Sequence, residues 1–184
     1  MRYLRLLFIL AVAIAGCAPY SLVGPEPVTI SGVYTVQPQI AWSAFTAGKW
    51  EHWTLDGFSL QDLSFLKGLE DGEQLRVQPE EKHPRFRKTM TASEIMEFVV
   101  DTYAAADFQK VTTSNLKPEK FGTAQGFRFE MTYLMPTGLE KQAIVVGAVL
   151  NERLYLIIYS GAGQHYYAKY KDHAERTIQS VRLK

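Results

Sequence analysis

The sequence predicts an α+β fold, in which two main helices pack on an antiparallel sheet that ends in a C-terminal three-strand meander. Three observations lead to this prediction. Residues 126–159 contain three strand-like segments joined by short turns, residues 91–106 carry a helical stripe, and residues 164–179 carry a second one. Because strands and helices do not alternate one by one along the chain, antiparallel pairing is favoured over parallel pairing.

The meander rests on the spacing of apolar residues. In residues 126–135 the apolar side chains fall at every second position, which is typical of a half-buried strand: Phe127, Phe129, Met131, Tyr133 and Met135. Residues 143–150 are apolar on both faces, so we expect a central strand there. Residues 154–159 form the third strand, and Asn151-Glu152 is the expected tight hairpin between the last two.

The two helices have different signals. Thr91 and Glu94 match a capping box, and the residues after them form one apolar stripe at helical spacing: Ile95, Met96, Phe98, Val99 and Tyr103. The second helix follows the small residues 160–163 and carries three tyrosines.

The first half of the chain gives weaker signals. Residues 28–36 are rich in β-branched side chains and predict one strand, and residues 39–42 predict another short one. Residues 79–88 are polar, contain two prolines, and are typical of an exposed loop. We expect a short strand and a loop over residues 111–123, and a closing strand over residues 180–183.

The first seventeen residues carry an export signal. Arg2 and Arg5 precede an unbroken apolar run of ten residues, 6–15, which is too short to span a bilayer because a spanning helix needs about 20. The run ends in Ile-Ala-Gly-Cys at residues 14–17, which resembles the bacterial lipobox. That resemblance implies cleavage by signal peptidase II between Gly16 and Cys17 and acylation of the Cys17 thiol.

An alternative cleavage remains open, because Ala-Ile-Ala at residues 13–15 also fits ordinary signal cleavage. It would release a protein that begins at Gly16 with a free thiol. Cys17 is the only cysteine, and the lipobox explains why a lone cysteine stands beside an export signal. In the lipoprotein family, a residue such as Ala18 after the cysteine implies the outer membrane, facing the periplasm.

The chain divides into residues 1–16 as signal peptide, 17–27 as lipidated cysteine and tether, and 28–184 as one α+β domain. The net charge is +1, and removal of two arginines with the leader would leave 18 basic and 19 acidic side chains. Such a balance argues against nucleic-acid binding, which needs a basic face. The expected partners are the membrane, through the lipid anchor, and a protein of the envelope.

The second half of the chain is similar to the PsbP-type fold, named for an extrinsic protein family of photosystem II. The likeness lies in Phe-Arg-Phe-Glu at residues 127–130, the doubly apolar segment 143–150, and segment 154–160 before a tyrosine-rich terminal helix. It covers residues 91–184. It implies a non-catalytic role, because that fold hosts assembly factors and binding modules.

Aromatic residues are the candidates for a ligand or partner surface. Trp42, Trp50 and Trp53 lie close together in the sequence, where they either line a pocket for a lipid, glycan or peptide or pack in the core. Tyr166 and Tyr170 share one face of the last helix and offer a second surface.

No motif predicts a catalytic residue, a metal site or a cofactor. The sequence contains no Gly-x-Ser-x-Gly and no His-Glu-x-x-His. The glycines of residues 160–163 lack the third glycine of a dinucleotide fingerprint, which would stand at Tyr166. The acidic residues 70–73 and the basic residues 82–88 are typical of solvated turns.

Three functions remain open. The favoured one is a non-enzymatic envelope lipoprotein whose domain binds a protein partner, as an assembly or accessory factor. The first alternative is a small-ligand binding lipoprotein with an aromatic pocket. The second alternative is an envelope hydrolase without a recognisable motif, which requires a nucleophile or paired carboxylates in a cleft.

Overall fold

The computed structural model describes residues 20–75 and 81–184, so the leader, Gly16 and Cys17 lie outside the described residues. An antiparallel eight-stranded sheet forms the centre, in the order β1-β4-β5-β6-β10-β9-β8-β7. Its strands are β1 (Ser21–Val23), β4 (Trp42–Ala47), β5 (Trp50–Thr54), β6 (Gln61–Leu69), β7 (Gln109–Phe121), β8 (Ala124–Leu134), β9 (Glu140–Leu150) and β10 (Arg153–Ala162).

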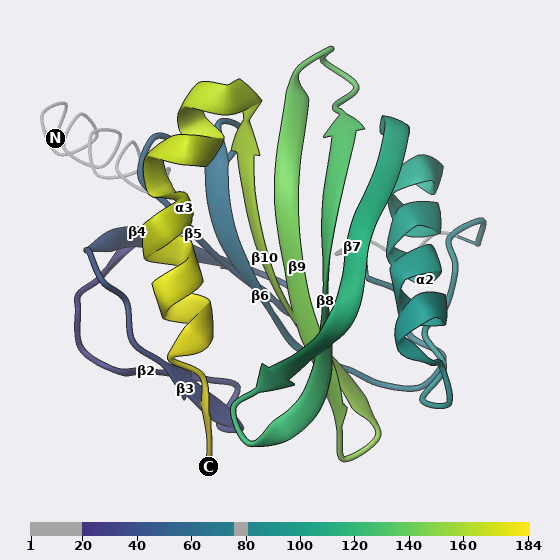
Figure 1. Cartoon of the computed structure of the whole chain (residues 1–184), viewed down its shortest axis with the longest axis horizontal. Helices are drawn as coiled ribbons and strands as arrows, with labels where there is room; N and C mark the ends of the chain where they lie inside the picture. Colours follow the sequence, from purple (N-terminus) through teal and green to yellow (C-terminus); the bar gives the residue numbers. More distant parts are fainter. Residues whose placement is uncertain (1–19, 76–80) are drawn as a thin grey trace, which may run out of the picture.

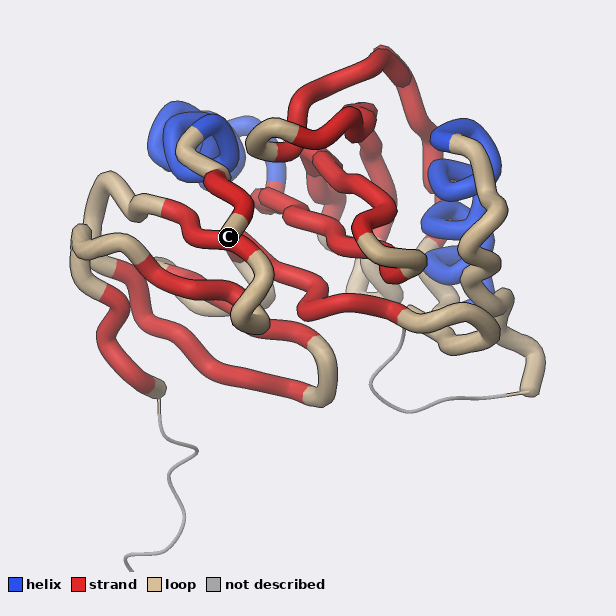
Figure 2. The backbone as a smooth tube through the Cα atoms, turned by 90° about the horizontal axis from the view of Figure 1, so that it is seen from below, coloured by secondary structure: helices blue, strands red, loops and turns tan. Residues whose placement is uncertain are grey.

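Two helices and a small sheet complete the described part of the fold (Figure 1). Helix α2 (Ala92–Ala105) and helix α3 (Gly163–Gln179) lie on opposite sides of the large sheet, as Figure 2 shows from below. The small sheet has the order β11-β3-β2 and joins the chain's last strand, β11 (Arg182–Leu183), to β3 (Tyr34–Val36) and β2 (Val28–Ile30).

The large sheet separates two apolar cores. The core on the α3 side includes Trp53, Leu63 and Phe65, and the core on the α2 side includes Leu66 and Leu69. Strand β6 therefore contributes to both cores, as a central strand with two covered faces does. This double burial explains why its apolar residues show no simple period in the sequence.

The helices cover unequal parts of the sheet. Helix α3 contacts β10, β9 and β6, at the middle of the sheet, whereas α2 contacts β7 and β8, at one end. Among the described residues, therefore, no helix lies over the α2 side of β4 and β5. Among the described residues, no helix is both long and apolar enough to cross a bilayer.

The capping box predicted for α2 is confirmed. The Thr91 hydroxyl accepts from the Glu94 amide at 3.3 Å, and the Glu94 carboxylate accepts from the Thr91 amide at 2.7 Å. Two of the four free amides at the start of the helix are thereby satisfied. The helix ends at Ala105, close to the predicted boundary.

The predicted meander of three strands is part of a longer run, because β7, β8, β9 and β10 are consecutive neighbours. Strand β7 has thirteen residues where the sequence predicted only a short strand and a loop. It lies at the edge of the sheet and is largely exposed, so it lacks an apolar period. Two register shifts in its pairing with β8, near Lys110 and Asn115, also interrupt the alternation.

Several expectations for the first half of the domain are wrong. The single strand predicted over residues 28–36 is a hairpin, because Ser31 and Gly32 adopt φ values of 47° and 73° and turn the chain between β2 and β3. The strand predicted at residues 39–42 begins at Trp42 instead. Residues 21–23, expected in the tether, pair with β4 as β1.

An exposed loop was expected over residues 79–88, of which the structure describes residues 81–88. Part of this described segment is buried. Phe86 is fully buried against the α2-side core. Its amide donates to the Glu73 carbonyl at 2.8 Å, and its carbonyl accepts from the Gly72 amide at 2.8 Å. The buried ring fixes the loop to the domain despite the polar residues around it.

The turn between β9 and β10 predicts a stabilising substitution. Asn151 and Glu152 have φ values of 48° and 64°, which glycine tolerates better than glutamate. We expect Glu152→Gly to raise the free energy of unfolding by about 1 kcal/mol, as measured by urea denaturation. Lys88→Met, which removes the exposed ion pair with Glu152, is the control and should change stability little. A lower urea midpoint for Glu152→Gly would contradict this account.

Candidate ligand-binding site

A cavity of about 440 Å³ lies on the α2 side of the sheet, where β4, β5 and β6 meet the end of α2. It lies beside α2, whose backbone is closest to β7 and β8 at one end of the sheet. Strands β4 to β6 contribute six of its residues: Phe45, Ala47, Trp50, His52, Asp62 and Ser64. Helix α2 and the residues after it contribute Thr102, Tyr103, Ala106 and Phe108, and Phe58, Leu75 and Ile158 complete the lining.

Aromatic rings form one wall of the cavity. The His52 ring stacks on Phe45 at 4.8 Å between centroids and lies nearly parallel to Trp50 at 6.0 Å. Phe58 meets the His52 ring edge-on at 4.8 Å. These side chains point to the same face because Phe45 and His52 are direct partners in the pairing of β4 with β5.

Below this wall lies a buried ion pair. The Asp62 carboxylate accepts from Lys141 Nζ at 3.0 Å, from Ser160 Oγ at 2.5 Å and from Ser64 Oγ at 2.6 Å. Asp62 is 6% exposed and Lys141 3%. Three strands, β6, β9 and β10, therefore meet at one carboxylate, and each donor helps to compensate for its loss of water.

The same carboxylate determines the tautomer of His52. The Ser64 hydroxyl donates to the Asp62 carboxylate, so the Ser64 proton points toward Asp62. Ser64 Oγ then accepts from His52 Nδ1, which lies 2.7 Å away. His52 consequently carries its proton on Nδ1, and Nε2 keeps a lone pair. Burial lowers the pKa of His52, and the negative charge of Asp62 opposes this only in part.

This arrangement is suited to binding rather than to nucleophilic attack. In a serine triad the histidine accepts the nucleophile's proton and the acid holds the histidine. Here Ser64 stands between the acid and the histidine, and its proton is committed to Asp62. Within residues 20–75 and 81–184, no three His, Cys, Asp or Glu side chains come together as a metal site.

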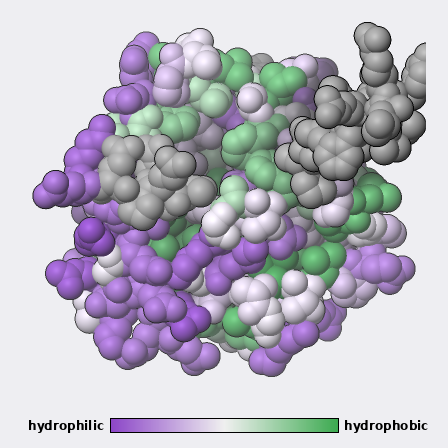
Figure 3. All heavy atoms as spheres, turned by 180° about the vertical axis from the view of Figure 1, so that it is seen from behind, coloured by the Kyte–Doolittle hydropathy of each residue, from purple (hydrophilic) through white to green (hydrophobic). Residues whose placement is uncertain are grey.

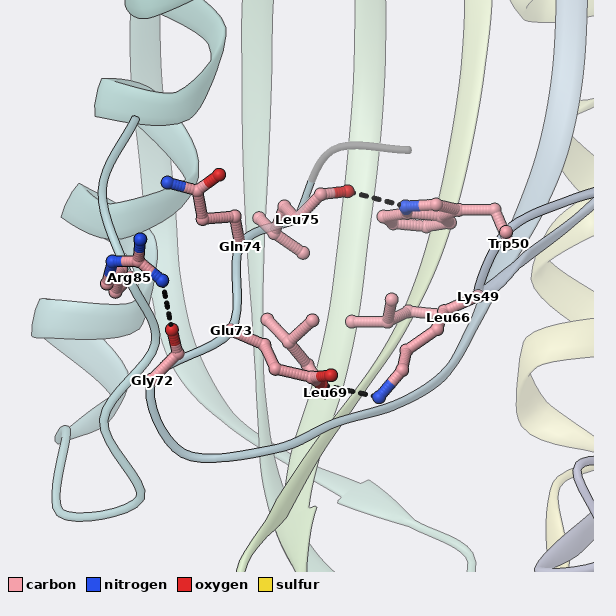
Figure 4. A pocket seen from close by; sticks show the side chains of 10 residues that line it. Lys49, Trp50, Leu66, Leu69, Gly72, Glu73, Gln74, Leu75 and Arg85 are labelled. Atoms are coloured by element: carbon pink, nitrogen blue, oxygen red, sulfur yellow. Dashed lines mark hydrogen bonds and ion pairs between the residues drawn. The ribbon is translucent and has the colours of Figure 1, made fainter. Parts of the chain in front are cut away.

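A second cavity of about 330 Å³ adjoins the first (Figure 4). Trp50 and Leu75 line both cavities, and Trp50 Nε1 donates to the Leu75 carbonyl at 2.7 Å. Figure 4 also shows Lys49 ion-paired with Glu73 across the second cavity. The Trp50 side chain thus forms part of the wall between the two hollows.

The three tryptophans singled out in the sequence do not act together. Trp42 and Trp53 are fully buried on the α3 side, where Trp53 packs on Phe65 with centroids 4.5 Å apart. A fully buried side chain presents no surface to a ligand or partner. Trp50 alone lines the cavities, because residues 50 and 53 of one strand point to opposite faces.

The tyrosines of α3 lie on the far side of the sheet from the cavity. Tyr170 is half-buried beside Trp42, and Lys169 Nζ lies 4.8 Å from the centre of its ring. The half-buried Tyr166 accepts at its carbonyl from the Tyr159 hydroxyl at 3.2 Å. Tyr167, rather than Tyr166, stacks on Tyr159 at 5.5 Å, and burial raises its pKa to about 12.

The residues of the polar floor were missed in the sequence. Asp62 and Lys141 are 79 positions apart, and only the pairing of β6 with β10 and of β10 with β9 brings them together. The available signal was the presence of Asp62, Ser64 and Lys141 in strands whose other residues are mostly apolar. Such residues need a buried partner.

Comparison with protein-family models and with curated protein sequences finds no match. The solution structure of cyanobacterial PsbP (CyanoP) from Synechocystis sp. PCC 6803 matches with a TM-score of 0.58 at 14% identity, over 93% of this chain and 96% of that chain. The fold resembles that of PsbP. The likeness extends beyond the residues 91–184 on which it was predicted.

A crystal structure from Bacteroides thetaiotaomicron VPI-5482 matches with a TM-score of 0.51 at 10% identity, over 88% of this chain and 48% of that chain. This chain therefore spans about half the length of that protein. LpqN, which is involved in cell envelope biogenesis of Mycobacterium tuberculosis, gives a TM-score of only 0.37 at 10% identity, which supports no argument. Identities this low show the fold alone.

The ion pair predicts strong coupling between two substitutions. Asp62→Asn or Lys141→Met leaves one buried charge without its partner, and we expect each to lower the free energy of unfolding by about 3–5 kcal/mol. The double variant should cost less than the sum of the two, because it buries no unpaired charge. Urea denaturation of the four proteins measures the coupling, and strictly additive losses would contradict it.

The lowered pKa of His52 predicts a pH dependence of stability. Unfolded histidine takes up a proton near pH 6.5, above the pKa of folded His52, so the unfolded state gains protons first as the pH falls. The free energy of unfolding should therefore decrease as the pH falls below about 6.5, by at most about 1.4 kcal/mol per pH unit for this group. His52→Gln should make the free energy of unfolding less dependent on pH between pH 7 and 5. If the pH dependence is unchanged in this variant, groups other than His52 cause it.

Proposed function

We propose that this protein is a non-enzymatic envelope lipoprotein that binds a small amphiphilic ligand in the aromatic cavity. The observation that supports this most is the cavity itself, an apolar hollow of about 440 Å³ with aromatic walls and a polar floor. Small-molecule sites typically have volumes of about 300–1,000 Å³, are mainly apolar, and contain a few placed polar groups.

The chemistry of the wall and floor limits the kind of ligand. Phe45, Trp50 and Phe58 favour an apolar or planar body, which stacks on rings or fills the space between them. His52 Nε2, in the aromatic wall, keeps a lone pair that can accept a hydrogen bond from a ligand. A ligand that combines an apolar body with one hydroxyl or amide donor therefore fits best.

The absence of catalysis is part of the proposal. Both serines near the cavity donate to Asp62, and neither donates to His52. A nucleophile needs a base that takes its proton. The hydrolase considered from the sequence is thus less well supported by this geometry than a binding role.

A second candidate is the binding of a protein partner, which an exposed apolar rim favours. Tyr20 is 55% exposed and Phe58 42%, and both rings contact Phe45, a cavity residue, at 5.3 and 5.5 Å. Figure 3 shows apolar residues gathered over part of the rear face, whereas its lower left is mostly hydrophilic. An apolar segment of a partner, as for an assembly or accessory factor, fits such a rim.

The envelope location is proposed from the leader, which lies outside the described residues. The lipobox at residues 14–17 and the lone Cys17 support a lipid anchor. Ala18 favours the outer membrane, with the domain in the periplasm. The PsbP-like fold is compatible with a non-catalytic role but is not by itself an argument for any location.

Trp50 provides a direct test of ligand binding. Because Trp42 and Trp53 are buried on the other side of the sheet, only Trp50 emission should respond to a ligand in the cavity. We expect a saturable change in tryptophan fluorescence with at least one member of a panel of lipids, glycans and apolar peptides. Trp50→Phe should abolish the change. Emission that is constant across the panel would contradict the proposal.

The anchor is tested by intact mass and fractionation of the full chain expressed in a Gram-negative host. We expect the wild type to be membrane-bound, to begin at Cys17, and to carry acyl mass, whereas Cys17→Ser should show none of these. A soluble wild type that begins at Gly16 would replace the anchor with ordinary signal cleavage.

A further inference from the structure

An exposed apolar surface lies where the described chain begins. We call it the apolar ledge and define it by Tyr20, Leu22, Phe45 and Phe58. Leu22 is 79% exposed, the largest fraction among the exposed large apolar residues, and Tyr20 is 55% exposed. Tyr20 directly precedes β1, and side chains two residues apart in an extended segment point to the same side. The ledge joins the cavity, because Phe45 and Phe58 also line it.

The strand that carries the ledge is fixed to the sheet. Ser21, Leu22 and Val23 of β1 pair with Ala44, Ser43 and Trp42 of β4. The Tyr20 ring meets the ring of Phe45, a cavity residue, edge-on with centroids 5.3 Å apart. The ledge therefore cannot move away from the domain without breaking the edge of the sheet.

The anchor limits how far the ledge can lie from the bilayer. Cys17 is three residues before Tyr20, and an extended chain spans at most about 3.6 Å per residue, so the two Cα atoms are at most about 11 Å apart. Acyl chains on Cys17 would lie in the hydrocarbon, with the cysteine itself near the headgroups. A tether this short holds Tyr20 next to the membrane surface.

The chemistry of the ledge suits that position. Tyrosine is favoured at membrane interfaces because its apolar ring and polar hydroxyl match the two sides. Leu22 and Phe58 add apolar surface that gains free energy on leaving water. Asp56, near Phe58 in the chain, is paired with Lys169 at 2.9 Å, so its charge is compensated beside the ledge.

From the short tether and the exposed side chains we infer that the apolar ledge docks on the lipid bilayer. The domain then sits with β1 and the mouth of the cavity toward the headgroups. The inference rests on the proposed anchor at Cys17. Docking also gives the proposed ligand a source, because amphiphiles can enter a cavity whose rim lies on the membrane directly from the lipid leaflet.

The test uses tryptophan reporters in the full acylated chain, in a Trp50→Phe background. Leu22→Trp places a reporter on the ledge. Leu116→Trp is the matched control, because Leu116 is an exposed leucine on β7, the opposite edge strand of the sheet. Each protein is reconstituted into phosphatidylcholine vesicles, with or without lipids brominated on the acyl carbons nearest the headgroup.

We expect brominated lipids to quench the emission of Leu22→Trp and to leave that of Leu116→Trp almost unchanged. Adding Phe58→Glu to Leu22→Trp should reduce the quenching, because a carboxylate resists the interface, whereas adding Leu116→Glu should not. Equal quenching at the two positions, or none at position 22, would overturn the inference and leave the ledge to a protein partner or a second copy.

The intact mass of the same samples separates the possible failures. If acyl mass is present on Cys17 and position 22 is not quenched, the docking is wrong while the anchor stands. If acyl mass is absent, the anchor is wrong and the docking falls with it. Ligand binding in the cavity is measured independently by the response of Trp50 in the wild type, so its failure is distinguished from both.

Discussion

The carboxylate of Asp62 is the group on which the arrangement of the candidate site depends. It is buried, it receives three donors from β6, β9 and β10, and it determines where the Ser64 proton points. The direction of that proton in turn determines which nitrogen of His52 keeps a lone pair. The buried Asp62 carboxylate therefore links three paired strands to the hydrogen-bonding capacity of His52 in the cavity.

The cavity itself follows from an imbalance between the helices. Helix α3 runs along the middle of the sheet, whereas α2 lies over β7 and β8 at one end. Within residues 20–75 and 81–184, no helix lies over the other end of the α2 side, where aromatic side chains of the sheet line the cavity. Large rings at Phe45, Trp50 and Phe58 partly compensate for the missing helix, and the space that they do not fill is the candidate site.

Local patterns in the sequence were sufficient for some elements and not for others. Helix α2 was predicted from Thr91 and Glu94 because a capping box is a contact within one turn. Strand β6 was not predicted, since it is buried on both faces. Strand β7 was predicted only as a short strand and a loop, since it is exposed and interrupted by register shifts. The pairing of Asp62 with Lys141 depends on strand order, so no local pattern contains it. Trp50 was recognised as a candidate, but only the register separates it from Trp53.

The pairing of β6 with β10 has a consequence for how the chain folds. Phe65 of β6 lies opposite Ile157 of β10, so one side of a central strand stays open until most of the chain is present. Such distant pairings slow folding, because the entropy of closing a long loop is lost before the contacts between the two strands form. During that interval a strand with apolar residues on both faces is exposed to other unfinished chains. Assistance by a chaperone during synthesis or export would shorten the exposure.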